Sequence, residues 1–118
     1  MITLLIALFA LPSSAAEKPA HTASYGCSGP GTSASVLDAF DKNMQRLFTS
    51  AEIKSDTFSY SGFVTSDSVV RGEVVYVTWA GQGFRLVGKF TPSLPSRNFS
   101  ATLHFNGRNE TVELGCLF

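Results

Sequence analysis

Residues 33–48 read SASVLDAFDKNMQRLF, and the secondary structure of this stretch decides the fold class. Apolar residues recur along it at intervals of three and four, the spacing that places side chains on one face of an α-helix. That face consists of Val36, Leu37, Phe40, Met44, Leu47 and Phe48. Ser35, with Asp38 three residues later, forms a weak capping box. The stretch therefore predicts an amphipathic N-terminal helix with one face to bury.

After Asp56 the apolar residues alternate with polar ones, which is the period of a β-strand. Five strand-like segments follow: TFSYSGFV (57–64), VVRGEVVYVTW (69–79), GFRLVGKF (83–90), FSATLHF (99–105) and ETVELGCLF (110–118). A further short strand is expected over 24–28. The predicted fold is α+β, with the helix packed on a curved antiparallel meander of about five strands. The alternative is a small all-β barrel whose lumen is filled by the aromatic side chains.

Two hairpin registers follow from four-residue loops between these segments. They pair Trp79 with Phe84 in one hairpin and Leu103 with Val112 in another. In the second hairpin, a two-residue turn would instead set Leu103 against Glu110 and bury a carboxylate. The longer loop is therefore preferred, since it places the apolar side chains of both strands on one face.

The N-terminal residues MITLLIALFALPSSAAE have the order of a secretory signal peptide. An apolar run from Ile2 to Leu11 precedes small residues, and cleavage is expected after Ala16 or, alternatively, Ala15. The run is shorter than the roughly 20 residues of a membrane span. Because no Lys or Arg precedes it, a buried N-terminal helix is the competing interpretation. The predicted organisation is a signal peptide over 1–16 and a single secreted domain over 17–118.

Cys27 and Cys116 are the only cysteines, and an even count in an exported chain predicts a disulfide between them. A metal site would need more ligands than the chain offers, and a lipid-anchored Cys27 would need the apolar run directly before it. The predicted location is secreted or periplasmic. Asn98 and Asn109 begin glycosylation sequons, which matter only in a eukaryotic producer.

The formal net charge is zero and no block of like charge occurs, so nucleic acid and a stable membrane anchor are not expected as partners. The catalytic motifs HExxH and GxSxG and a dinucleotide-binding glycine pattern are absent from the sequence. His104 and Glu113 could lie diagonally across neighbouring strands, which is the one arrangement suggestive of acid–base chemistry. The sequence predicts no enzymatic activity, no cofactor and no metal.

A small, neutral, disulfide-linked domain without catalytic motifs favours a protein-binding or inhibitor-like function. The partner would be another protein, which includes a second copy of the chain. Apolar side chains on the outer sheet face suggest the contact surface, since that face should otherwise be polar. Its candidate residues are Phe63, Val74, Tyr76, Arg85 and Val87. The alternative function is a carrier of a small apolar ligand in a cavity lined by phenylalanines, Tyr60 and Trp79.

Overall fold

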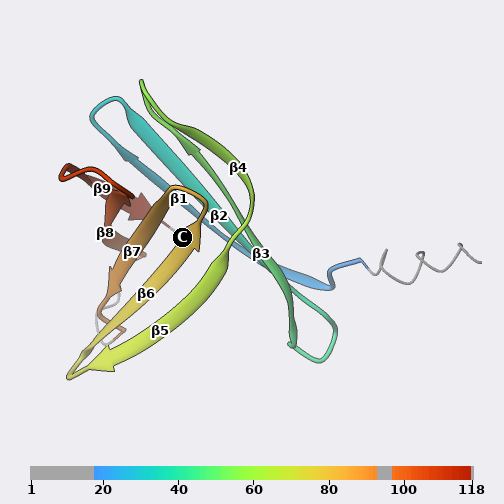
Figure 1. Ribbon diagram of the computed structural model, residues 1–118. Helices are drawn as coiled ribbons and strands as arrows, with labels where there is room; N and C mark the ends of the chain where they lie inside the picture. Colours follow the sequence, from blue (N-terminus) through green and yellow to red (C-terminus); the bar gives the residue numbers. More distant parts are fainter. Residues whose placement is uncertain (1–17, 93–96, 118) are drawn as a thin grey trace, which may run out of the picture.

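The computed structural model describes residues 18–92 and 97–117, and this part of the chain is all-β (Figure 1). Its nine strands are β1 (His21–Gly29), β2 (Thr32–Phe40), β3 (Arg46–Lys54), β4 (Ser59–Phe63), β5 (Thr65–Arg71), β6 (Val74–Gly81), β7 (Phe84–Phe90), β8 (Asn98–Phe105) and β9 (Thr111–Leu117). They form one antiparallel sheet in the order β4-β3-β2-β1-β9-β8-β7-β6-β5.

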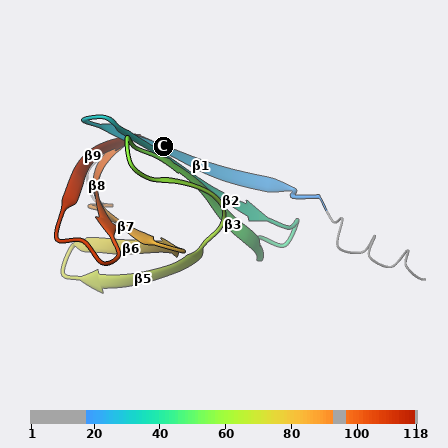
Figure 2. The ribbon, with the colours of Figure 1, turned by 45° about the horizontal axis from the view of Figure 1, so that its top comes forward.

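The sheet curls into a half-barrel (Figures 1 and 2). One wall contains β1 to β4 and the other contains β5 to β9, and the walls meet where β1 pairs with β9. The two edge strands, β4 and β5, follow each other in the chain with only Val64 between them. The Val64 N–H donates a hydrogen bond to the Thr49 carbonyl at 2.9 Å, which holds this corner against β3. Because the sheet is curled, the apolar side chains of both walls face one common interior.

The predicted helix over 33–48 is wrong, and with it the α+β fold class. This stretch forms most of β2, a turn and the start of β3. The alternative prediction, a small barrel, was also all-β, and this class agrees with the structure. The sheet, however, curls only into a half-barrel. The intervals of four residues that suggested a helix are even numbers, so they also place side chains on one face of a strand. Pairing of β2 with both β1 and β3 then decides the conformation, because a strand satisfies its backbone hydrogen bonds on both sides.

The turn between β2 and β3 is stabilised by one aspartate. Asp41 Oδ1 accepts hydrogen bonds from the backbone N–H groups of Asn43 at 2.8 Å and Gln45 at 2.9 Å. Asp commonly makes such bonds to its own backbone in turns. Met44 adopts a positive φ of 62°, a conformation that few side chains other than Gly, Asn and Asp take readily.

The predicted register of the last hairpin is confirmed, with Leu103 opposite Val112. The register of β6 and β7 is wrong by two residues, because Trp79 lies opposite Leu86 and the turn is shorter than expected. Residues 69–79 were expected to be one strand, but a turn at Gly72 divides them between β5 and β6. Gly72 has a φ of 65°, which glycine adopts without strain.

The predicted disulfide is present and joins Cys27 of β1 to Cys116 of β9 across a Cα–Cα distance of 4.0 Å. The two residues are directly opposite each other in a ladder of only three residue pairs, whereas β1 and β2 share nine. Both cysteines are buried in the core. The bridge therefore reinforces the shortest junction of the sheet. No helix in the described residues is long and apolar enough to cross a membrane, and the predicted signal peptide lies outside them.

Candidate functional site

One end of the half-barrel is filled by aromatic rings. Phe84 and Phe105 are buried there, and the Phe58 ring contacts both, with centroids 5.9 Å and 5.3 Å away. The Tyr60 ring lies 4.9 Å from that of Phe84. Gly81 allows this packing, because a Cβ at that position would lie 2.6 Å from the Phe84 ring and 2.9 Å from the Tyr60 ring. The protein's own aromatic side chains therefore fill this end of the half-barrel.

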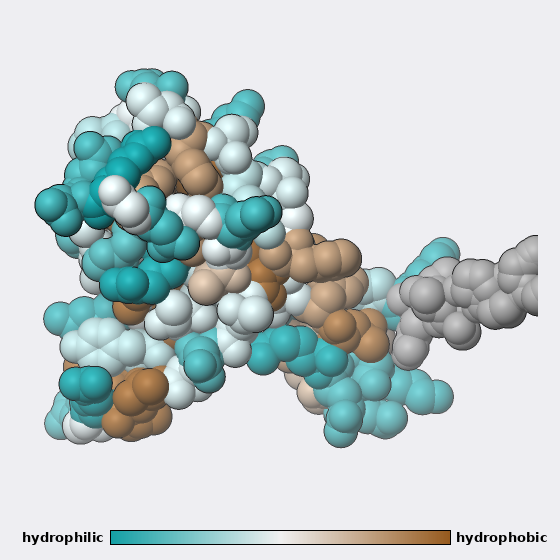
Figure 3. Space-filling model, viewed as in Figure 1, coloured by the Kyte–Doolittle hydropathy of each residue, from teal (hydrophilic) through white to brown (hydrophobic). Residues whose placement is uncertain are grey.

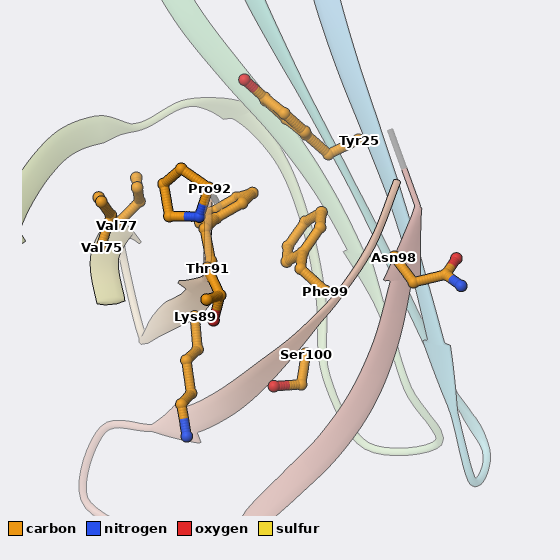
Figure 4. A pocket seen from close by; sticks show the side chains of 10 residues that line it. Tyr25, Val75, Val77, Lys89, Thr91, Pro92, Asn98, Phe99 and Ser100 are labelled. Atoms are coloured by element: carbon orange, nitrogen blue, oxygen red, sulfur yellow. The ribbon is translucent and has the colours of Figure 1, made fainter. Parts of the chain in front are cut away.

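The other end of the half-barrel contains a pocket of about 600 Å³. Its lining comes from β1, β6, β7 and β8, and Figure 4 shows how the side chains are arranged. Tyr25 and Phe99 approach the space beside Val75 and Val77, whereas Asn98 and Lys89 point away from it. The pocket is therefore apolar where its walls meet and polar at its rim.

Aromatic side chains form the inner wall of this pocket. The Phe90 and Phe99 rings stack with their centroids 4.1 Å apart, and the Tyr25 ring meets Phe99 edge-on at 6.0 Å. Tyr25 also lies 5.5 Å from the ring of the buried Trp79. Such pairs fix ring orientation, since edge-to-face and offset arrangements are preferred. The result is a preformed aromatic surface, the kind that lines small-molecule sites.

A second cavity of about 330 Å³ adjoins the first and shares Tyr25, Val75, Val77 and Phe90 with it. Its remaining lining is mostly polar: Asp38, Arg46, Ser66, Asp67, Ser68 and Trp79. It lies between the β2–β3 side of one wall and the edge strand β5 of the other. Together the two cavities make one recess with an aromatic side and a polar side, which we call the mouth recess.

Asp38 is the centre of the polar side. Its side chain is only 5 % exposed, and its Oδ1 accepts a hydrogen bond from Thr49 Oγ1 at 2.5 Å. Arg46 Nε lies 3.4 Å from the same oxygen. A bulge at the end of β2 sets Arg46 opposite Phe40 and so brings the guanidinium to the carboxylate. The buried charge is thereby paired, as a buried carboxylate requires.

Tyr25 connects the aromatic and polar sides. Its phenol lies close enough to the Asp38 carboxylate for the two groups to interact electrostatically. Burial raises the pKa of the Tyr25 phenol above its ordinary value of 10.0, and the nearby Asp38 carboxylate raises it further while Arg46 lowers it. The phenol therefore stays neutral at physiological pH.

Trp79 carries an unpaired donor beside this recess. The residue is 1 % exposed, and its indole Nε1 has no hydrogen-bond partner in the described part of the chain. A buried donor left in this state costs about 1–3 kcal/mol of stability. The ring is held in place by the Tyr25 ring on one side and by Gly88, where a Cβ would lie 3.0 Å from Trp79 Cζ3. The indole N–H is thus an unsatisfied donor in a residue that lines the polar cavity.

The predicted contact residues fall into two groups. Val74 and Tyr76 on β6 and Arg85 and Val87 on β7 lie on the outer face of one wall. Phe63 is on β4, the edge strand of the other wall, where it is 72 % exposed and packs against Phe48. The first four therefore form one surface, and Phe63 belongs to another.

His104 and Glu113 occupy the outer face of β8 and β9 but have different partners. His104 lies opposite Arg85 and Thr111, while the Glu113 carboxylate accepts a hydrogen bond from Thr102 Oγ1 at 3.1 Å. Burial and the Arg85 guanidinium lower the pKa of His104 below its usual 6.5, and Glu113 raises it. The two side chains lie outside the mouth recess.

Sequence reasoning did not find the residues of the mouth recess. Asp38 was interpreted as part of a capping box of the expected helix, and Tyr25 as part of a short strand without a functional role. The signal was present in β2, where Thr32, Ala34, Val36 and Asp38 alternate with mostly exposed residues and are all buried. Among the described residues, no group of His, Cys, Asp and Glu could hold a metal ion.

No family model, curated protein or solved structure matches this chain. Function must therefore be argued from the half-barrel and its recess.

Proposed function

We propose that this chain is a binding protein for a small, largely apolar ligand, which it holds in the mouth recess. The observation that carries this proposal is the contrast between the two ends of the half-barrel. The rings of Phe58, Tyr60, Phe84 and Phe105 fill one end, whereas the rings of Tyr25, Phe90 and Phe99 line a pocket of about 600 Å³ at the other. A pocket of this size and apolar lining is typical of small-molecule sites.

The polar side of the recess supports ligand binding rather than simple incomplete packing. Asp38 is buried, accepts a hydrogen bond from Thr49 and is paired with the more exposed Arg46, so these polar contacts are in place before any ligand arrives. A preorganised polar group beside an aromatic wall fixes the orientation of a ligand and lowers the entropic cost of binding.

A bulky residue placed inside the recess tests this proposal. We expect Val77→Trp to weaken binding of the neutral fluorescent probe N-phenyl-1-naphthylamine by at least about tenfold, because the new ring occupies the pocket. The matched control is Thr78→Trp, the next residue on β6, which lies opposite Val87 on the outer face. The measurement is a fluorescence titration, with thermal melts to show that both variants are folded. Equal probe affinity in the two variants would contradict the proposal.

Export is the compartment consistent with this proposal. A disulfide in the core is stable outside the reducing cytoplasm, where an extracellular or periplasmic binding protein would meet its ligand. The disulfide is compatible with a secreted or periplasmic location, and the expected signal peptide supports the same proposal.

A protein contact on the outer face of β5–β7 is the second candidate function. The observation that favours it is the apolar side chain of Val69 on the edge strand β5, which is 51 % exposed. Its neighbour Val70 is 68 % exposed but lies opposite Val75, on the other face of the strand. Figure 3 shows hydrophobic surface at the β5–β6 hairpin, at the lower left of the view. Val69 lies opposite Tyr76, so this surface continues onto the predicted contact face. An unpaired edge strand can accept another strand, and the neutral chain does not repel a second copy.

Self-association is the measurable consequence of this second candidate. We expect the sedimentation coefficient of the wild-type protein to rise with concentration, and Tyr76→Ala to reduce that rise because an aromatic anchor is lost. Ser61→Ala on β4, the strand at the opposite end of the sheet order, is the control. A concentration-independent monomer in the wild type would exclude the second copy as the partner.

A further inference from the structure

The unpaired indole N–H of Trp79 indicates the chemistry of the ligand. Trp79 is the only tryptophan of the chain and one of its most completely buried large side chains. Its Nε1 is the only buried side-chain nitrogen or oxygen without a hydrogen-bond partner in the described residues. Indole is a donor only, so the missing partner is an acceptor.

The orientation of the indole ring is determined by its neighbours. Its Cζ3 edge lies against Gly88 of β7, where a Cβ would come within 3.0 Å. Nε1 is at the opposite edge of the indole, so it is turned away from β7. Ser66 of β5 lies opposite Trp79, and both residues line the polar part of the mouth recess. The ring is also confined by Tyr25 at 5.5 Å and Phe90 at 6.4 Å, which prevents it from rotating toward another partner.

The charges around the recess favour an uncharged acceptor. Asp38 and Asp67 both line the polar cavity, and Arg46 is the only cationic side chain among its lining residues. Arg46 is already paired with Asp38. Lys89 lines the aromatic pocket but points away from it, so an anionic ligand would meet mainly the two carboxylates. A cationic group itself has no lone pair to offer Trp79. A carbonyl or ether oxygen on an apolar ring system avoids both conflicts.

We propose that the ligand of the mouth recess is a neutral, ring-containing molecule with a hydrogen-bond acceptor, and that Trp79 Nε1–H donates to that acceptor. The aromatic wall of Tyr25, Phe90 and Phe99 receives the ring system. The indole N–H then selects an oxygenated compound over a plain hydrocarbon of the same shape. This inference rests on the proposed function, since it specifies what the same recess binds.

Two probes of nearly equal shape separate these possibilities. 2-Acetylnaphthalene carries a carbonyl acceptor. In 2-ethylnaphthalene a CH₂ group stands in place of that carbonyl, so the acceptor is absent. We expect the wild-type protein to bind the ketone about 5- to 50-fold more tightly, because only the ketone satisfies the buried donor. In Trp79→Phe, which keeps an aromatic ring but has no N–H, we expect this preference to disappear. Isothermal titration calorimetry gives all four affinities.

The wild-type protein alone provides a second readout. Because Trp79 is the only tryptophan, the ¹⁵N-labelled protein has a single indole N–H resonance. We expect 2-acetylnaphthalene to move the indole proton downfield, as a new hydrogen bond does, and 2-ethylnaphthalene to leave it near its original position. This comparison remains decisive if Trp79→Phe does not fold.

The outcomes distinguish the inference from the proposed function. Preference for the ketone together with the downfield shift supports the inference. Equal affinities for the two probes in the wild type, with no selective shift, would overturn it while leaving the recess as a binding site. Binding of neither probe would overturn the proposed function and the inference together.

Discussion

Replacing both cysteines, as Cys27→Ser with Cys116→Ser, lowers the free energy of unfolding by about 2–5 kcal/mol, which corresponds to a fall in melting temperature of roughly 10–20 °C. The expected loss is large because the bridge spans a sequence separation of 89 residues. It also joins β1 to β9, whose ladder contains only three residue pairs. Without the bridge, the half-barrel loses the strongest connection between its two walls. Thermal unfolding followed by circular dichroism measures the effect.

The control for this result is a reductant added to both proteins. Reduction should lower the melting temperature of the wild type toward that of the double serine variant and leave the variant unchanged. A wild-type melting temperature that is insensitive to both treatments would show that the β1–β9 junction is stable without the disulfide.

Phe84→Ala lowers the free energy of unfolding by about 3–5 kcal/mol, because it removes a buried ring from the filled end of the half-barrel. The Phe84 side chain is 1 % exposed and contacts the rings of both Phe58 and Tyr60. These neighbours cannot collapse into the space, since they are held by β4 and the loop that precedes it. Denaturant unfolding provides the measurement.

Phe90→Ala is the matched variant at the other end of the same strand. The Phe90 ring is only half-buried and lines the mouth recess, so its loss should cost about 1–2 kcal/mol of stability. It should also weaken binding of N-phenyl-1-naphthylamine, whereas Phe84→Ala should bind the probe normally at a temperature where it is folded. If both variants lose equal stability and equal probe affinity, the two ends of the half-barrel do not differ in function.

The disulfide and the last hairpin could be predicted from the sequence because both depend on local or countable features. Two cysteines in a chain expected to be exported allow one intramolecular pairing, and the structure has it. The β8–β9 register follows from burying Leu103 with Val112 and keeping Glu110 out of the sheet. The cysteines allow only one pairing, and the other hairpin register would bury the Glu110 carboxylate at a cost in stability.

The fold class could not be predicted because residues 33–48 satisfy two periodicities. The positions that suggested a helical stripe include Val36 and Phe40, whose spacing of four also suits one face of a strand. Tertiary context decides between them: β2 is paired along its length with β1 and β3. That context depends on strands distant in sequence, which no local window contains.

The residues of the mouth recess could not be predicted from the sequence either, because tertiary structure brings them together. Tyr25 and Asp38 lie on neighbouring strands of one hairpin, but Trp79 is distant in the sequence and meets them only after β6 has curled over the same interior. A buried aspartate is exceptional, so nothing local distinguished Asp38 from a solvated residue. The unpaired indole N–H is likewise a property of packing and has no sequence signature.

The strand order also determines how the chain reaches this structure. Seven of the eight ladders join strands that are consecutive in the chain, and β1 with β9 is the single exception. Hairpins form within microseconds because their loops are short, whereas bringing distant segments together requires a large loss of chain entropy. Pairing β1 with β9 is therefore the one event in which two strands distant in the chain must find each other. A chain already oxidised at Cys27 and Cys116 begins folding with that event complete.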